Sequence, residues 1–211
     1  MLSRRKLLKR SKIYLILDTQ VNTYQELFEI AKQVIDNGVT IFQLRDKNGD
    51  AKAILEFSRK MIKLTAGRAL YIVNDRLDLA LLSGADGVHL GQEDIDIADA
   101  RKILNKQFLV GKSCQTYARA RKAEQEGADY IGFGSVYKTL TKPGRNPMDL
   151  ELLSKVYRNI SLPVFAIGGI ETSNLKQLLS LGVDRIAVCR AICRHKNPAL
   201  ASQNFHQLMG G

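Results

Sequence analysis

The chain has 211 residues, of which 45% are hydrophobic and 25% are charged, and its formal net charge is +11. This apolar fraction is too high for a disordered chain, and no window reaches the ~18 uninterrupted apolar residues of a membrane span. The length fits one large domain or two small ones, and such a chain buries a core without disulfides or structural metal. Composition therefore excludes collagenous, disulfide-stapled and integral membrane proteins.

The first twelve residues form a strongly basic segment that carries six cations, Arg4, Arg5, Lys6, Lys9, Arg10 and Lys12. The apolar run that follows ends at Asp18, which is too early for an export signal. We expect residues 1–12 to be a disordered arm in front of a single domain over 13–211. Without these six cations the net charge falls to +5, and the remaining basic residues are dispersed without interleaved aromatics, which disfavours nucleic-acid binding.

Eight short apolar runs follow along the chain, and each is nearly continuous in apolar character, as in parallel strands with both faces buried. They cover residues 13–17, 39–44, 70–73, 87–90, 108–110, 130–133, 164–167 and 186–188. Amphipathic segments at helical spacing lie between them, among them 24–35, 53–64, 118–126 and 175–181. This alternation predicts a compact (β/α)8 TIM barrel. The alternative, an open doubly wound sheet, lacks a Gly-x-Gly-x-x-Gly motif after the first run.

Polar residues directly follow the predicted strands, where the functional loops of such a barrel lie. Gln43, Arg45 and Lys47 alternate along one strand end, so they point to one side. A guanidinium beside an ammonium suits a diphosphate, although both cations could also form a solvated face. Other strand ends carry Asn74-Asp75-Arg76, Gly91-Gln92-Glu93-Asp94, Gly111-Lys112-Ser113, Gly134-Ser135 and Cys189-Arg190.

Two carboxylates, Asp75 and Asp94, follow adjacent predicted strands close to cations. Each could cap the helix after it, but together they favour Mg²⁺, which takes one or two carboxylates plus phosphate and water oxygens. His89 lies inside a strand and is interpreted as a packed barrel residue. The cysteines Cys114, Cys189 and Cys193 are too sparse for a thiolate zinc site, and we interpret them as reduced thiols of a cytoplasmic protein.

Two further segments suit phosphate. The pair Gly168-Gly169 ends a predicted strand, where backbone amides can approach a ligand without interference from a Cβ atom, although it could be a simple tight turn. The longest loop, residues 135–148, carries Thr139, Thr141 and Lys142 and then Pro143-Gly144. A loop of this length is usually functional or disordered, and its composition predicts a phosphate-gripping lid.

These motifs, in this order, resemble those of the thiamine phosphate synthase family over about residues 13–208. The segments that carry the resemblance are Gln43-Leu44-Arg45-Asp46-Lys47, Asn74-Asp75-Arg76, Gly87-Val88-His89-Leu90-Gly91-Gln92-Glu93-Asp94, Thr139-Leu140-Thr141-Lys142 and Ala166-Ile167-Gly168-Gly169-Ile170. The resemblance implies a transferase of thiamine biosynthesis. Such an enzyme joins hydroxymethylpyrimidine diphosphate to a thiazole phosphate and releases diphosphate.

The resemblance also implies residue roles. Arg45, Lys47 and Lys142 would act catalytically by neutralising the leaving diphosphate, and Asp75 and Asp94 would bind Mg²⁺. Substrate binding would fall to Gln43, Leu44, Arg45, Asp46, Lys47, Asn74, Ser113, Thr139, Leu140, Thr141, Lys142, Gly169, Cys189 and Arg190. The expected partners are these small molecules, with no membrane and, as for many barrels, a possible homo-oligomer.

Three positions depart from the usual family pattern, namely Cys114-Gln115, Ser135 and Arg190. We expect Arg190 to add a cation to the thiazole phosphate site. The alternatives are a thiazole tautomerase paralogue, a non-catalytic barrel that senses thiamine phosphate, and nucleic-acid binding by the basic arm.

Overall fold

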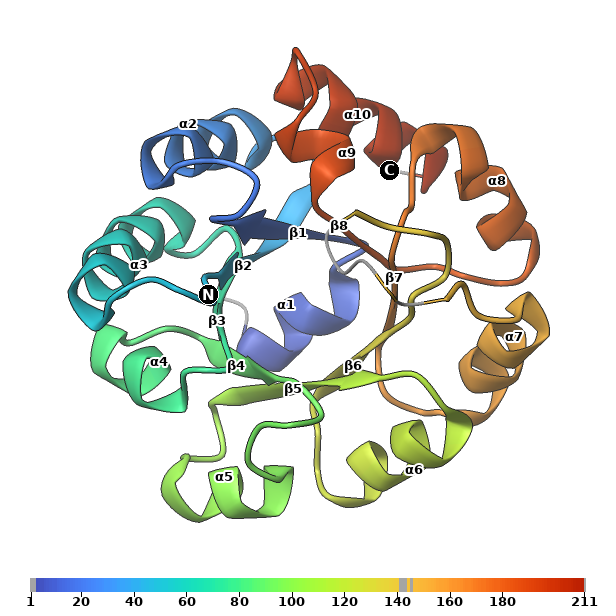
Figure 1. Ribbon diagram of the computed structural model, residues 1–211, viewed down its shortest axis with the longest axis horizontal. Helices are drawn as coiled ribbons and strands as arrows, with labels where there is room; N and C mark the ends of the chain where they lie inside the picture. The colour runs from blue at the N-terminus through green and yellow to red at the C-terminus, as the bar shows by residue number, and fades with distance from the viewer. Residues whose placement is uncertain (1–2, 141–143, 145, 211) are drawn as a thin grey trace.

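The eight strands form a closed parallel barrel in chain order, and helices surround it (Figure 1). The computed structural model describes residues 3–140, 144 and 146–210. The strands are β1 (Ile13–Asp18), β2 (Val39–Arg45), β3 (Leu70–Asn74), β4 (Gly87–Leu90), β5 (Leu109–Cys114), β6 (Tyr130–Phe133), β7 (Val164–Ile167) and β8 (Ile186–Val188). The TIM-barrel prediction is therefore confirmed.

At least one helix follows each strand. The helices are α1 (Arg4–Arg10), α2 (Tyr24–Val34), α3 (Ala51–Thr65), α4 (Leu77–Ser83), α5 (Ile97–Ile103), α6 (Tyr117–Gln125), α7 (Leu150–Asn159), α8 (Thr172–Ser180), α9 (Arg190–Cys193) and α10 (Pro198–Leu208). None of those in the described part of the chain is both long and apolar enough to cross a membrane.

Several strands extend further than the apolar runs predict. The largest difference is in β5, which continues to Cys114 and so contains Lys112 and Ser113 instead of ending before them. Its residues pair in register with β6, with Lys112 opposite Ile131 and Ser113 opposite Gly132. Ladder hydrogen bonds are made by the backbone, so a polar side chain does not end a strand whose neighbour continues.

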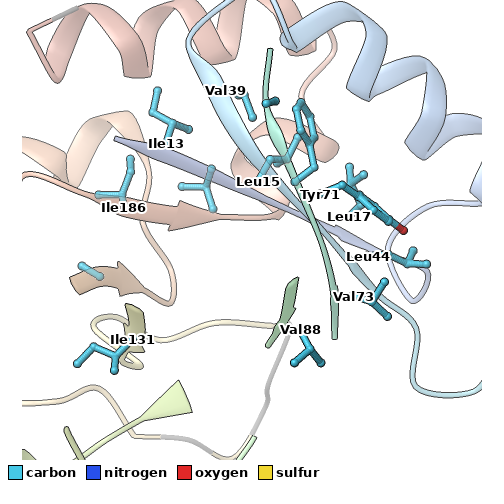
Figure 2. Packing of buried hydrophobic residues seen from close by; sticks show 14 of the residues in the cluster. Ile13, Leu15, Leu17, Val39, Leu44, Tyr71, Val73, Val88, Ile131 and Ile186 are labelled. Carbon is cyan, nitrogen blue, oxygen red and sulfur yellow. The ribbon is translucent and has the colours of Figure 1, made fainter. Parts of the chain in front are cut away.

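Alternate residues of each strand face opposite sides of the barrel wall and form two separate cores. The outward set packs against the helices; Figure 2 shows Ile13, Leu15 and Leu17 of this set along β1. The inward set is a smaller cluster that fills the barrel, and its members include Tyr14, Ile16, Ile41, Leu70, Ile72, Leu109, Tyr130 and Phe165. Polar residues that share the inward register therefore project into the barrel interior.

Local capping fixes where helices begin beside the barrel. In α2 the Thr23 side chain accepts from the Glu26 backbone N–H while Glu26 accepts from the Thr23 backbone, a reciprocal capping box. The helix then buries Leu27, Ile30 and Val34, which share one face at helical spacing. The α2 helix is thereby held against the outer core beside the end of β1.

Helix α1 corrects the expectation of a disordered arm over the described part of residues 1–12. Its Leu8 is 2% exposed and joins the inner cluster. Arg4 Nε lies 2.7 Å from Asp86 Oδ1, and an Arg5 guanidinium nitrogen lies 2.8 Å from Asp129 Oδ1, at the residues that precede β4 and β6. The cations thus meet carboxylates at the amino ends of the strands, and α1 lies across the middle of the ring of strands in Figure 1.

Candidate active site

A cavity of about 210 Å³, here called the central pocket, lies inside the barrel towards the carboxyl ends of the strands. Nine of the residues that the sequence predicts for substrate binding line it: Gln43, Arg45, Asn74, Ser113, Thr139, Leu140, Gly169, Cys189 and Arg190. They come from six strands and the loops after them, so the fold gathers residues that are distant in sequence. Thr141 and Lys142 lie outside the described residues.

Arg45 is held in place by a carboxylate that the sequence analysis did not select. The Asp18 side chain is 1% exposed, and its Oδ2 lies 2.6 Å from Arg45 Nη1. The two residues are also directly paired in the β1–β2 ladder. Gln20 Oε1 accepts a longer bond of 3.4 Å from the same nitrogen. The signal for Asp18 was present in the sequence, because a carboxylate ends the first apolar run.

The side chains of Leu44 and Asp46 point away from the central pocket. Leu44 belongs to the outer core. Asp46 accepts hydrogen bonds from the backbone N–H groups of Asn48 and Gly49 and from the Tyr24 hydroxyl, and these bonds lower the pKa of its carboxyl although burial opposes the shift. Both therefore shape the loop that presents Arg45, and their side chains do not reach the pocket.

Lys47, Asp75 and Asp94 form a charged cluster at the rim beside Asn74. Lys47 donates to Asp75, and the carboxyls of Asp75 and Asp94 are hydrogen-bonded to each other. Burial opposes ionisation of Asp75, but the bonds from Lys47 and Asp94 lower its pKa, while burial and contact with Asp75 raise the pKa of Asp94. Two adjacent carboxylates repel unless a proton or a cation lies between them.

Local backbone geometry holds these two carboxylates at the rim. Asp75 has a φ of 61°, a left-handed conformation that residues other than glycine rarely adopt and that concentrates at functional sites. Asp94 Oδ2 accepts from the Gly91 backbone at 2.5 Å. Neither residue caps a helix, because α4 begins after Arg76 and α5 after Asp96 without a side-chain cap.

The cluster fits a hard divalent cation. Within the described part of the chain no group of three or more His, Cys, Asp or Glu side chains gathers around a potential metal position. A pair of carboxylates is what Mg²⁺ uses when phosphate and water oxygens complete its shell. Zinc, by contrast, takes three or four protein ligands.

The lower wall of the central pocket carries a buried polar network. Tyr14 OH lies 3.0 Å from Tyr130 OH and accepts from Gln43 Nε2. His89 lies 3.3 Å from Tyr130 OH through Nδ1 and 3.0 Å from Ser113 Oγ through Nε2. His89 is thus packed within the barrel as expected. Tyr14 and Tyr130 were not selected from the sequence, although the alternation along β1 and β6 places both on the inward face.

The opposite wall is built from glycines and the start of α9. Gly168 and Gly169 have φ values of 110° and 62°, and a Cβ on Gly169 would lie 2.4 Å from the Lys138 carbonyl oxygen. Glycine is therefore required here by both conformation and space. Lys138, which the sequence analysis did not select, lines the pocket together with Cys189 and Arg190. Leu140, on the loop above, is 74% exposed.

Two residues of β5 are buried in the outer register of the strand, although Cys114 also borders the central pocket. Lys112 is 6% exposed and donates to the Ile95 carbonyl oxygen at 3.3 Å. Cys114 is buried, and burial raises the pKa of its thiol to about 12, so it stays protonated. The Cys114 departure from the family pattern therefore adds no reactive thiolate to the site.

Fold and site together define a TIM barrel with a polar pocket that Arg45 and Arg190 help to line, and with the charged cluster of Lys47, Asp75 and Asp94 beside it. Residues 13–192 match the family model described as thiamine monophosphate synthase, and the chain belongs to this family.

Curated relatives and solved structures agree. Thiamine-phosphate synthase of Gloeobacter violaceus is 43% identical over 199 residues, 94% of this chain and 57% of that protein. The synthase of Chlorobium phaeovibrioides is 42% identical over 82% of this chain and 84% of its own length. Thiamine phosphate pyrophosphorylase from Pyrococcus furiosus superposes with a TM-score of 0.88 at 34% identity, covering 97% of this chain and 98% of that one. The chain thus spans little more than half the length of some curated relatives.

Proposed function

We propose that this protein is a thiamine phosphate synthase, which couples hydroxymethylpyrimidine diphosphate to hydroxyethylthiazole phosphate. The bond between the pyrimidine methylene carbon and the diphosphate oxygen breaks, and its electron pair leaves with diphosphate. The thiazole nitrogen lone pair then forms the new carbon–nitrogen bond. The observation that carries the proposal is the juxtaposition of Arg45 and Lys47 with the Asp75–Asp94 pair beside an enclosed pocket, in a chain of this family.

The cations at the β2 end bind the diphosphate. Arg45 offers a guanidinium that Asp18 already holds in one orientation, so little of its conformational freedom is lost on binding. Lys47 is 44% exposed and adds a second positive charge at the rim. Mg²⁺ held by Asp75 and Asp94 would supply further charge to neutralise the departing diphosphate. Lys142 is assigned the same role by the resemblance alone.

The remaining walls hold the two rings and keep water out. Gln43, Asn74 and Ser113 line the central pocket and are assigned to the pyrimidine. Thr139, Gly169, Cys189 and Arg190 lie on the other wall and are assigned to the thiazole phosphate, with Thr141 as a further candidate. An electron-poor pyrimidine methylene would react with water, and Lys138, Thr139 and Leu140, which line the pocket after β6, help to exclude it.

The alternatives are less well supported. A thiazole tautomerase needs neither a diphosphate cradle nor a metal pair, and a thiamine phosphate sensor needs no metal carboxylates. The Arg45 and Lys47 cations and the adjacent carboxyls of Asp75 and Asp94 therefore support the synthase over both alternatives. The three cysteines are free thiols, which supports the expected cytoplasmic location.

A coupling assay tests the proposal. Purified protein with both substrates and Mg²⁺ is expected to form thiamine phosphate and diphosphate, and a chelator is expected to abolish product. Asp75→Asn should lower kcat about a hundredfold or more, because one carboxylate of the pair is lost. Asp36→Asn, which alters an exposed carboxylate paired with Arg68, is the matched control and should behave as wild type. Undiminished product in excess chelator would remove the metal from the proposal.

A further inference from the structure

Five side chains inside the barrel form a continuous hydrogen-bonded chain from β2 to β5. In order they are Gln43, Tyr14, Tyr130, His89 and Ser113. Both ends of this chain line the central pocket. Its three middle members have no role in the proposed function so far.

The chain has a direction, because each hydroxyl carries a single hydrogen. In the orientation that the structure gives its amide, Gln43 donates from Nε2 to Tyr14 OH. Within the described residues the remaining partner of the Tyr14 hydroxyl is Tyr130 OH, so we assign the Tyr14 hydrogen to Tyr130 and the Tyr130 hydrogen to His89 Nδ1. On this assignment His89 carries its proton on Nε2 and donates it to Ser113 Oγ. Every donor and acceptor along the path is consistent with this one assignment.

The surroundings favour a chain of neutral groups held in fixed positions. Tyr14 and Tyr130 are 2% and 0% exposed, and burial raises the pKa of both phenols far above neutral pH, so each keeps its hydrogen. Their rings pack edge to face at 5.8 Å. Gly111 leaves the necessary space, because a Cβ there would lie 2.2 Å from the Tyr130 ring and 2.6 Å from His89 Nδ1.

The two ends of the chain then present opposite hydrogen-bonding groups to the pocket. The Gln43 carbonyl oxygen Oε1 has no hydrogen-bond partner within the part of the protein that the structure describes, and it remains an acceptor. Ser113 already accepts from His89, so its own hydrogen is available to a ligand. An acceptor and a donor match a 4-aminopyrimidine edge, whose amino group donates and whose adjacent ring nitrogen accepts. The 4-oxo analogue carries the reverse pattern.

We propose that Tyr14, Tyr130 and His89 are positioning residues that fix the polarity of this chain and thereby select an aminopyrimidine over its oxo analogue. The identity of the ligand rests on the proposed function. The direction of the hydrogen-bonded chain does not depend on it. If the Gln43 amide were reversed, every bond would reverse, and the same walls would select the oxo compound. The direction is therefore a measurable property of the free protein.

Nitrogen NMR of the imidazole rings measures this direction without any ligand. The protein has three histidines, so His195→Gln and His206→Gln assign the His89 signals by elimination. At about pH 8 we expect His89 as the neutral tautomer protonated on Nε2. Tyr130→Phe should remove the donor to Nδ1 and shift that nitrogen's resonance. A His89 protonated on Nδ1, or on both nitrogens, would overturn the inference.

Calorimetric binding tests the selection. In the presence of Mg²⁺ the wild type should bind the aminopyrimidine diphosphate at least about tenfold more tightly than the oxo analogue. Tyr130→Phe should lose most of this preference yet bind inorganic diphosphate as before, and Tyr14→Phe is a second variant with the same expectation. Tyr71→Phe is the matched control, because it removes a buried hydroxyl that bonds to Ser58 on the outer side of the barrel.

The binding results distinguish the role of the hydrogen-bonded chain from the substrate assignment. If Tyr130→Phe and Tyr14→Phe keep the full preference for the aminopyrimidine, the proposed role of the hydrogen-bonded chain is overturned and the synthase proposal stays intact. A wild type that binds inorganic diphosphate but neither pyrimidine compound would overturn the substrate assignment, whatever tautomer His89 adopts.

Discussion

The Asp18–Arg45 pair shows how one buried contact can prepare a binding group. Arg45 is 8% exposed, so its charge is costly unless a partner offsets it, and Asp18 lies behind it in the adjacent strand. A buried charge that loses its partner costs about 3–5 kcal/mol. Asp18→Ala should therefore lower the free energy of unfolding by roughly this amount and also weaken binding of inorganic diphosphate. Urea unfolding and calorimetry measure the two effects, and a stable variant with normal diphosphate affinity would contradict the prediction.

Arg190 gives a second prediction for a single residue. It lines the central pocket at the start of α9, on the wall assigned to the thiazole phosphate. If its guanidinium adds a cation there, Arg190→Ser should raise the KM for thiazole phosphate about tenfold, in keeping with a charged hydrogen bond, and should leave the KM for the pyrimidine diphosphate unchanged. Steady-state kinetics with each substrate varied in turn gives both values. An unchanged or lower KM for thiazole phosphate would show that Arg190 obstructs the site or does not contact the ligand.

At the scale of elements, α1 packs against the barrel through the buried Leu8, the partly buried Leu7 and the ion pairs of Arg4 and Arg5. Leu8 is buried in the inner cluster, whereas Lys6 on the same helix is exposed. Leu8→Ala should lower the free energy of unfolding by about 2 kcal/mol, the lower part of the range for buried leucines, because a short terminal helix can adjust. Lys6→Ala is the control and should leave it nearly unchanged. Equal urea midpoints for the two variants would mean that α1 contributes nothing to the barrel.

The same element shows what the sequence could and could not predict. Apolar runs located all eight strands, and the residues after them located Arg45, Asn74 and the Gly168-Gly169 turn, because parallel strands end together. Charge density made residues 4–10 look like a solvated arm, since the carboxylates that receive Arg4 and Arg5 lie more than eighty residues away. Long-range partners of this kind leave no local pattern.

The residues that line the central pocket could likewise be predicted only in part. Alternation within a strand indicates which residues share a face, and so Gln43 and Arg45 were correctly grouped. It does not indicate which face of a fully apolar strand points inward. For this reason Tyr14 and Tyr130 were overlooked. Leu44 and Asp46 were included because the resemblance covers the whole motif, although their side chains turn away. Which face of such a strand points inward is determined only when the strands close into the barrel.

For the whole molecule, buried phenols link stability to pH. Tyr14, Tyr71 and Tyr130 are nearly or fully buried, and burial raises the pKa of each above the usual value of about 10. The folded state therefore holds these protons more tightly than the unfolded state, so their contribution to stability is intact below about pH 10 and is lost as pH rises further. Urea midpoints should fall as pH rises above about 10, and the tyrosinate absorbance of these three residues should rise only as the barrel unfolds. Early ionisation of all seven tyrosines in the folded protein would contradict this.

Leu8 of α1 packs with Tyr14, Tyr130 and Phe165 in the inner cluster, so the amino end of the barrel is filled. With that end filled, a ligand that lies further into the barrel must bind before one that lies above it. Gln43 and Ser113 line the pocket next to the inner polar network, and Gly169 and Arg190 line it beside α9. For the proposed coupling reaction we therefore expect ordered binding, in which the ligand held by Gln43 and Ser113 binds first and the ligand beside α9 binds second.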